Sequence, residues 1–214
     1  MAFLGVKELP SSVVDTFRQL VESRGHKVSD QAWTEARRLL IPVSANRGDV
    51  LMDSGHVSKD LLIVSSGIAA SVQTDTQGDQ HIARFFERGQ LCTNITSAWH
   101  QSVASDQVVA MTLLSGVQIP FAQFRNEYMA GGPIAEYWRE MVIETLLFDK
   151  EVMCAKTTRD VRARYRFLVE RYENVIPDVP DKFIARFIGI TPQGLSRYLK
   201  NSRNKLTKAN ESIG

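Results

Sequence analysis

The chain is poor in cysteine and has no long apolar run. Its two cysteines, Cys92 and Cys154, lie far apart without metal-ligand spacing, which argues against a disulfide framework, an iron–sulfur cluster and a zinc site. No stretch reaches the roughly 18 apolar residues of a membrane span. The first residues, MAFLGVKELP, lack the basic-then-apolar order of a signal peptide. We therefore expect a reduced, cytoplasmic protein with no membrane partner.

The sequence also lacks the residue patterns of an enzyme. A metalloenzyme on a β-roll, of the cupin kind, needs clustered His and carboxylate ligands, but HxH and HxxxxE spacings are missing. No Gly-rich phosphate loop, nucleophile elbow or paired-acid motif is present either. The four histidines are scattered in the sequence, which favours surface positions over haem ligation: His26, His56, His81 and His100. We expect no catalytic residue, no metal and no cofactor.

Charge is distributed unevenly, although the net charge of the 214 residues is only +2. Residues 1–158 hold 14 Lys and Arg against 18 Asp and Glu, a net charge of −4. Residues 159–214 hold 12 against 6, a net charge of +6. This asymmetry suggests two domains, the second facing a polyanion, although a basic solvated tail would give the same numbers.

Hydrophobic patterning predicts an α+β chain. Residues 11–40 carry two amphipathic helical stripes. Between 41 and 120, short runs of Val, Ile, Phe and Leu are punctuated by glycines that recur every 11 to 12 residues from Gly55 on. That rhythm is typical of an antiparallel sandwich or roll. The segment DTQGDQ (75–80) is a plausible hairpin turn, because Gly78 can adopt φ > 0.

Residues 134–158 predict one long helix with a seven-residue apolar repeat. Its middle, MVIETLLF (141–148), is apolar on more than one face, so a single partner could not cover it. We expect one face to meet a second copy of the chain, and the alternative is a long helix buried within one monomer. The predicted dimer interface comprises Ile134, Trp138, Met141, Thr145, Phe148 and Val152.

Residues 181–200, DKFIARFIGITPQGLSRYLK, predict two short helices joined by a tight turn. A helix-turn-helix needs a small residue where its helices cross, a turn residue that tolerates φ > 0, and a buried aliphatic on the second helix. Ala185, Gly189 and Leu195 meet these demands. Thr191 is a suitable N-cap, with Pro192 at the first helical position, so the second helix is expected to begin there.

The outward face of this second helix carries the predicted DNA contacts. Gln193 and Arg197 lie near its start, where a recognition helix reads base edges: Gln suits adenine and Arg suits guanine. Ser196 could contact either base, and Thr191, Lys200 and Arg203 are better placed for phosphates. The alternative is a helical hairpin with a solvated basic face. The basic charge of the last quarter favours DNA binding.

This layout resembles the Crp/Fnr family of bacterial transcription regulators over nearly the whole chain. The resemblance is carried by RGDVLMDSGHVSKDLLIVSSGIAASV (47–72), by HIARFFERGQL (81–91) and most specifically by residues 162–200. It implies an antiparallel double-stranded, jelly-roll-like β-roll with flanking helices in 1–132, a dimerisation helix in 133–158 and a winged helix-turn-helix in 159–214. It also implies a homodimer on a roughly palindromic DNA site, RNA polymerase as a further partner, and allosteric control by an effector in the roll.

The effector corner departs from the family pattern. Cyclic-nucleotide binders of the family carry Gly-Glu-Leu, then an Arg-Ser or Arg-Thr pair about ten residues later; here the residues are Gly89-Gln90-Leu91 and Ala104-Ser105. Losing the arginine opposite a buried phosphate costs several kcal/mol. We therefore expect a small-molecule effector other than cyclic AMP, or a constitutive DNA binder with a vestigial pocket. Nearby Cys92 could sense oxidation or act as a small buried filler.

Overall fold

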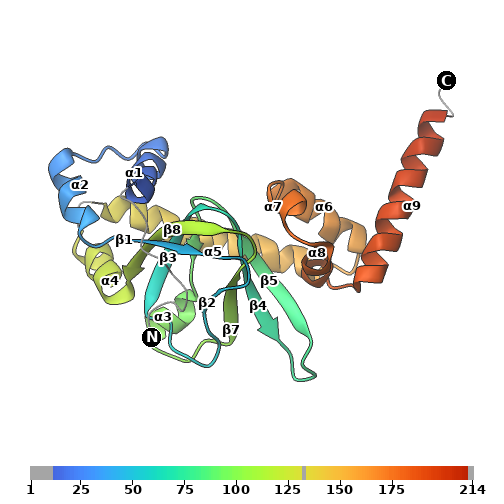
Figure 1. Cartoon of the computed structure of the whole chain (residues 1–214), viewed down its shortest axis with the longest axis horizontal. Coiled ribbons are helices and arrows are strands. Elements are labelled where there is room, and N and C mark those ends of the chain that lie inside the picture. The colour runs from blue at the N-terminus through green and yellow to red at the C-terminus, as the bar shows by residue number, and fades with distance from the viewer. Residues whose placement is uncertain (1–11, 132–133, 212–214) are drawn as a thin grey trace.

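The structure is a computed structural model that describes residues 12–131 and 134–211. Its centre is a roll of two four-stranded antiparallel sheets, with strand orders β1-β8-β3-β6 and β2-β7-β4-β5 (Figure 1). This confirms the predicted antiparallel roll. The strands are β1 (Ile41–Ala45), β2 (Val50–Met52), β3 (Asp60–Ser66), β4 (Ala69–Thr74), β5 (Gln80–Phe86), β6 (Leu91–Cys92), β7 (Asp106–Ala110) and β8 (Leu114–Pro120).

The β4–β5 hairpin forms where the sequence predicts it. Thr74 pairs with Gln80, and Gly78 adopts φ +87° between them. The Asp75 carboxylate accepts the backbone N–H groups of Gln77 and Asp79, both at 2.9 Å. The turn is thus held by a local aspartate as well as by glycine's freedom at positive φ.

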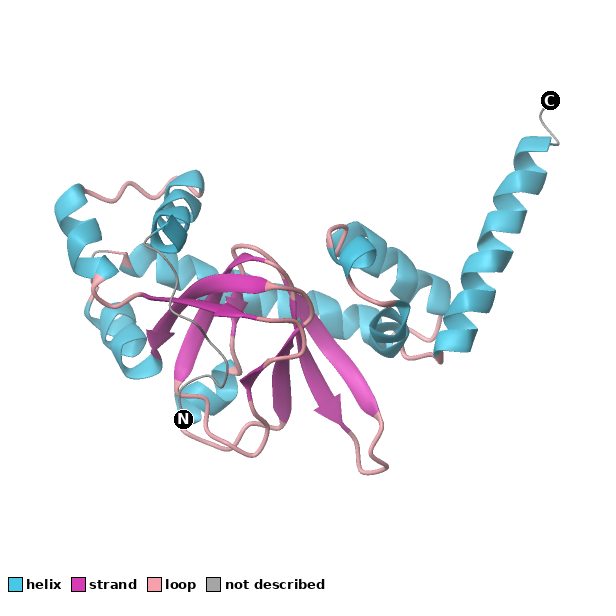
Figure 2. Ribbon diagram, viewed as in Figure 1, coloured by secondary structure: helices cyan, strands magenta, loops and turns pink. Residues whose placement is uncertain are grey.

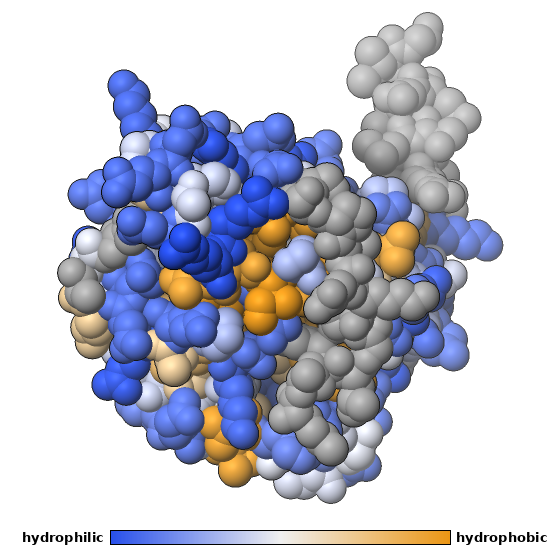
Figure 3. Space-filling view, turned by 60° about the vertical axis from the view of Figure 1, so that its left-hand side comes forward, coloured by the Kyte–Doolittle hydropathy of each residue, from blue (hydrophilic) through white to orange (hydrophobic). Residues whose placement is uncertain are grey.

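Helices flank the roll at both ends (Figure 2). The expected helical region 11–40 is two helices, because the chain turns at Gly25 with φ +85°. Figure 3 turns the end that carries residues 12–37 toward the viewer, and the surface there is mostly hydrophilic with smaller apolar areas. The helices are α1 (Ser12–Ser23), α2 (Asp30–Arg37), α3 (Ile95–His100), α4 (Phe121–Ala130), α5 (Ala135–Thr157), α6 (Val161–Arg171), α7 (Val175–Asp178), α8 (Asp181–Ile188) and α9 (Pro192–Glu211).

The long helix α5 runs along the roll and joins its two ends (Figure 1). Near its start, Trp138 and Met141 pack with Phe17 and Phe124 in one apolar cluster. The predicted domain limit near 132 falls outside the described residues, and the limit near 158 falls just after α5. The division into three domains stays a prediction.

The stripe predicted as a dimer interface faces this chain's own core, which corrects the prediction. Ile134, Trp138, Met141 and Val152 are each 5 % exposed or less, whereas Thr145 and Phe148 are half-buried. The exposed apolar residues of α5 lie on another side, and we call them the outer stripe: Ile143, Leu146, Leu147 and Met153, each 54 to 61 % exposed. The sequence does contain the apolar seven-residue repeat, but the exposed apolar residues lie two positions away from the predicted ones. Two residues correspond to about 200° around a helix, so the outer stripe faces the other side of α5.

A second apolar cluster joins the C-terminal helices to the roll, and we call it the junction cluster. Phe85 of β5 contacts Phe187 of α8 and Tyr172, with ring centroids 5.5 and 5.6 Å apart. Helices α6 to α9, which we call the helical unit, therefore rest on the outer face of the sheet β2-β7-β4-β5. The buried members are Ile68, Ala70, Val72, Ile82, Phe85, Met111, Val152, Leu168, Tyr172, Val175, Val179, Ile184, Ala185, Phe187, Ile188 and Leu195.

Lysine 156 of α5 closes part of the sheet edge at this junction. β5 is the last strand of its sheet, and the Lys156 amine donates to the carbonyl oxygens of Ile82 at 2.6 Å and Ala83 at 3.4 Å. Burial lowers the pKa of Lys156. Carbonyls that would face outward from an edge strand are thus bonded within the chain.

Candidate nucleic-acid interface and effector corner

Helices α8 and α9 form the predicted helix-turn-helix. Gly189 ends α8 at φ +71°, and its N–H donates to the carbonyl of Ala185. The N–H of Ile190 donates to the same carbonyl at 3.0 Å. Ala185 and Leu195 are 0 and 1 % exposed. Ala185 is therefore the small buried residue, Gly189 the turn residue and Leu195 the buried aliphatic residue, as the sequence predicts.

The start of α9 is fixed by its cap. The N–H of Gly194 donates to the Thr191 hydroxyl at 3.1 Å, and the N–H of Leu195 donates to the Thr191 carbonyl at 3.0 Å. A Cβ at Gly194 would lie 3.2 Å from that hydroxyl oxygen, closer than ordinary van der Waals contact. Glycine at 194 thus leaves room for the cap, an intramolecular reason for its place in the first turn.

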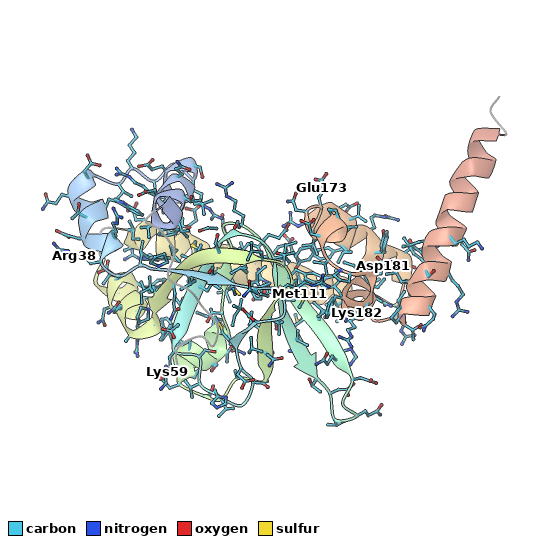
Figure 4. All side chains as sticks on the ribbon, viewed as in Figure 1. Arg38, Lys59, Met111, Glu173, Asp181 and Lys182 are labelled. Atoms are coloured by element: carbon cyan, nitrogen blue, oxygen red, sulfur yellow. The ribbon has the colours of Figure 1, made fainter. Side chains whose placement is uncertain are left out.

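Four of the predicted contact residues share the open face of α9. Gln193, Ser196, Arg197 and Lys200 are exposed and follow the i, i+3, i+4, i+7 spacing of one helix face. Exposed Thr191 stands at the end of this face. In Figure 4 α9 projects away from the roll. Arg203 lies further along α9, beyond the last side chain that the structure describes.

The opposite face of α9 anchors it to the rest of the helical unit. Leu195 is buried in the junction cluster, and the Tyr198 ring meets that of Tyr165 on α6 at 5.3 Å. No strand follows Pro120 among the described residues, so the predicted wing has no counterpart there. The described unit can present one polar helix face while its apolar side stays covered.

The predicted effector residues are split between two places, which corrects the sequence-based site. Gly89, Gln90 and Leu91 line a cavity of about 400 Å³ between the roll and α5. Ala104 and Ser105 do not line it. The backbone of Ala104 pairs instead with the loop before β3, accepting from Gly55 and donating to His56, both at 2.9 Å.

The arginines of this cavity are already neutralised. Arg84 of β5 is 7 % exposed and pairs with Asp149 of α5. Its Nη2 also donates to Gln90 Oε1 at 3.3 Å. The other two arginines of the lining have carboxylate partners too: Arg24 pairs with Glu144, and Arg171 pairs with Glu151 at 2.8 Å. The Arg84–Asp149 pair has no local sequence signal, because the two residues are 65 positions apart.

A carboxylate of the protein occupies the second part of the predicted corner. Asp106, next to Ser105, accepts hydrogen bonds from the hydroxyl of Ser71 and the side-chain amide of Asn94. These are donors that an anionic ligand would use. Two residues after Ala104, where the family pattern has an arginine, this chain thus carries a carboxylate that already accepts two hydrogen bonds.

Cys92 has the properties of a buried filler. It is 0 % exposed, and burial raises the pKa of its thiol, so the unreactive protonated form is favoured. In the described part of the chain, no group of three or more His, Cys, Asp or Glu side chains could hold a metal ion. Nor does any helix in these ranges have the length and apolarity needed to cross a membrane.

A β-roll, a long connecting helix and a helix-turn-helix against the roll define the Crp/Fnr type of fold. FixK2 from Bradyrhizobium japonicum has this fold at a TM-score of 0.64 and 14 % identity, covering 78 % of this chain and 85 % of that one. CooA from Carboxydothermus hydrogenoformans, solved as a double mutant, gives 0.63 and 13 %, covering 84 and 87 %.

Two further solved structures match over similar lengths. The c-di-GMP-responsive global regulator CLP of Xanthomonas campestris gives a TM-score of 0.62 at 13 % identity, covering 83 % of this chain and 93 % of that one. A candidate Crp/Fnr regulator from Eubacterium rectale gives 0.61 at 16 %, covering 83 and 85 %. No protein-family profile and no curated protein matches the chain. At these identities the likeness shows the fold.

Proposed function

We propose that this chain is a DNA-binding transcription regulator that reads a specific duplex sequence with the first turns of α9. The observation that carries the proposal is the open face of α9. Its polar and basic side chains start at a capped, well-defined helix end, and the buried side of the helix is fixed to a compact unit. The fold shared with solved regulators supports the same function.

The chemistry of the open face suits major-groove recognition. The Arg197 guanidinium can donate two hydrogen bonds to guanine O6 and N7, and the Gln193 amide can pair with adenine. Thr191 and Lys200 lie at the two ends of this face, where contacts to phosphate oxygens would fix the register of the helix. Base readers in the middle with phosphate contacts on either side are the arrangement that sequence-specific binding needs.

The first experiment removes one base reader. A preferred duplex is selected from a random pool, and binding of wild type and Arg197→Ala is measured by fluorescence anisotropy. We expect Arg197→Ala to weaken binding to the selected duplex by about 1–3 kcal/mol and to relax one base position per half-site. Arg38→Ala, an exposed arginine at the opposite end of the molecule (Figure 4), is the control and should bind like wild type. Equal losses on all duplexes would refute base reading by Arg197.

The proposed regulator is a homodimer whose two copies contact each other through the outer stripe of α5. Ile143, Leu146 and Met153 follow the spacing of three and seven residues that a helix pair uses at its seam. A two-fold dimer would present α9 twice, which matches a roughly palindromic site. The exposure of these residues in the single chain supports this register.

For the effector we propose that the corner at Gly89–Leu91 does not bind cyclic AMP. All three of its arginines have carboxylate partners, so none of them is free to neutralise a phosphate. We expect saturating cyclic AMP to leave the melting temperature unchanged, because a ligand that binds only the folded state raises it. A cyclic-AMP-binding protein in the same experiment is the positive control. A clear upward shift would contradict the proposal, whereas no shift fits another effector or a constitutive binder.

A further inference from the structure

A second cavity lies outside the effector corner, where the roll meets the helix-turn-helix, and we call it the junction cavity. It has a volume of about 740 Å³, which is in the range of small-molecule sites. Figure 4 places two of its lining residues, Met111 and Lys182, close together where the roll meets α8. The lining residues are Arg47, Gly48, Val50, Val72, Gln80, Gln107, Val109, Ala110, Met111, Lys182, Phe183 and Arg186.

The charge of this lining is of one sign. Arg47, Lys182 and Arg186 line the cavity, and no lining residue is acidic. None of the three forms an ion pair with another described residue. The arginines of the effector corner, by contrast, each have a carboxylate partner. Of the effector corner and the junction cavity, it is therefore the junction cavity whose cations are free to meet an anion.

The same cavity offers an apolar wall and an aromatic ring. Val72 and Met111 are 6 and 3 % exposed, and the half-buried Phe183 ring lies across the cavity on α8. The Lys182 amine and the Arg186 guanidinium carbon lie 4.8 and 5.6 Å from the centre of that ring. A flat heterocycle could pack on Phe183 and the valines while its charged groups reach the cations.

Amide groups complete the polar lining. The Gln80 side chain accepts a hydrogen bond from Arg186 at 3.0 Å, a contact between the hairpin strand β5 and α8. Gln107 of β7 also lines the cavity. Side-chain amides can both donate and accept, so they can pair with the edge of a base. The site thus combines cations, an aromatic face and two amides from elements of both the roll and the helix-turn-helix.

We propose that the junction cavity binds a free nucleotide that carries two or more phosphate groups. The phosphates meet Arg47, Lys182 and Arg186, and the base lies against Phe183. Because its walls come from the sheet β2-β7-β4-β5 and from α8, the bound nucleotide fixes the helix-turn-helix against the roll. The proposal that the cavity binds a nucleotide does not depend on the proposed function. The expectation that the nucleotide affects DNA binding does rest on the proposed function.

Binding is tested by calorimetry on the full chain with ATP, ADP, AMP and inorganic pyrophosphate. We expect saturable binding of ATP and ADP and weaker binding of AMP. Arg47→Gln and Lys182→Gln should each weaken ATP binding about tenfold or more, since hydrogen bonds to charged groups are lost. Arg38→Gln is the matched control and should bind ATP like wild type. Melting temperatures establish that each variant is folded.

A second variant separates ring recognition from charge. Phe183→Leu keeps an apolar side chain and should weaken ATP binding while leaving pyrophosphate binding unchanged. The absence of ATP binding by wild type, or equal ATP binding by Arg47→Gln and Lys182→Gln, would overturn the proposal. Pyrophosphate that binds as tightly as ATP would overturn the role of the base.

The DNA arm distinguishes this proposal from the proposed function. In nucleotide-free buffer, Arg47→Gln and Lys182→Gln should bind the selected duplex like wild type, whereas Arg197→Ala should lose DNA and keep ATP. If the two cavity variants lose DNA affinity without nucleotide, the cavity is part of the DNA contact surface and the nucleotide proposal fails. If every variant, Arg197→Ala included, keeps its DNA recognition, the result counts against the proposed function. The calorimetry then decides by itself whether the junction cavity binds a nucleotide.

Discussion

A side chain at position 194 would compete with the hydroxyl of Thr191 for one small volume at the start of α9. In an open helix, alanine is favoured over glycine by up to about 1 kcal/mol. Here the added Cβ would lie 3.2 Å from the Thr191 hydroxyl oxygen that caps the helix. The effect of a substitution at 194 on stability should therefore depend on whether the cap is present.

A double-mutant cycle tests this dependence by chemical denaturation. Thr191→Ala should cost about 1 kcal/mol of unfolding free energy through loss of the cap. Gly194→Ala should give little or no gain in wild type, but should stabilise the Thr191→Ala background by up to about 1 kcal/mol. The same effect of Gly194→Ala in both backgrounds would show that the close approach carries no energy.

Residue-level features were predictable where their cause is local. Thr191 and Pro192 mark a helix start, and Gly189 marks a turn, because capping and backbone preferences act over a few neighbouring residues. The Arg84–Asp149 pair was not predictable, since the two residues are 65 positions apart and meet only because α5 lies across β5. A local pattern does not say which carboxylate will reach a buried arginine.

In helix α5, the seven-residue apolar repeat predicts a helix but does not tell which face of that helix is buried. Its sequence has apolar residues on two faces, and a seven-residue repeat fits both. The face with Trp138 and Met141 packs on the protein's own core, while the face with Leu146 and Met153 is exposed. Only the position of α1 and α4 decides between them, because these helices cover the first face.

The two faces of α5 predict opposite responses to charge. Leu146→Glu combined with Met153→Glu should give a folded monomer, because both side chains are exposed in the single chain. Met141→Glu should instead lower the melting temperature strongly, because that side chain is 3 % exposed. Light scattering and thermal melts of the two variants measure this. A double variant that remains dimeric would refute the outer stripe as the seam.

The junction cluster packs the helix-turn-helix against the roll, and we expect the two to open as one unit. β4 carried a sequence signal for it: Ala69 faces the interior of the roll, whereas Ala70 and Val72 face the helices, so the strand is apolar on both sides. A strand buried on both faces needs cover on both. The antiparallel roll was predicted from glycine spacing, but the identity of that cover depends on contacts between distant segments.

Removing a ring from the junction cluster should therefore loosen both parts. Phe85→Ala, at a fully buried site, should cost about 3–5 kcal/mol and increase hydrogen exchange in α8 as well as in β5. Phe124→Ala removes an equally buried ring from the α1–α5 cluster and is the control, with the increase expected near α4 and α5 instead. If Phe85→Ala leaves exchange in α8 unchanged, the two parts open independently.

The hydrogen bonds of Lys156 to β5 hold the end of α5 against the roll. Lifting the end of α5 from the roll would release the carbonyls of Ile82 and Ala83 along the open side of an edge strand. A free edge of that kind is a template for pairing with a strand of another molecule. A rearrangement that lifted this end of α5 would therefore expose a stretch of strand edge to which another copy of the protein could pair, whereas one that left Lys156 in place would keep that edge covered.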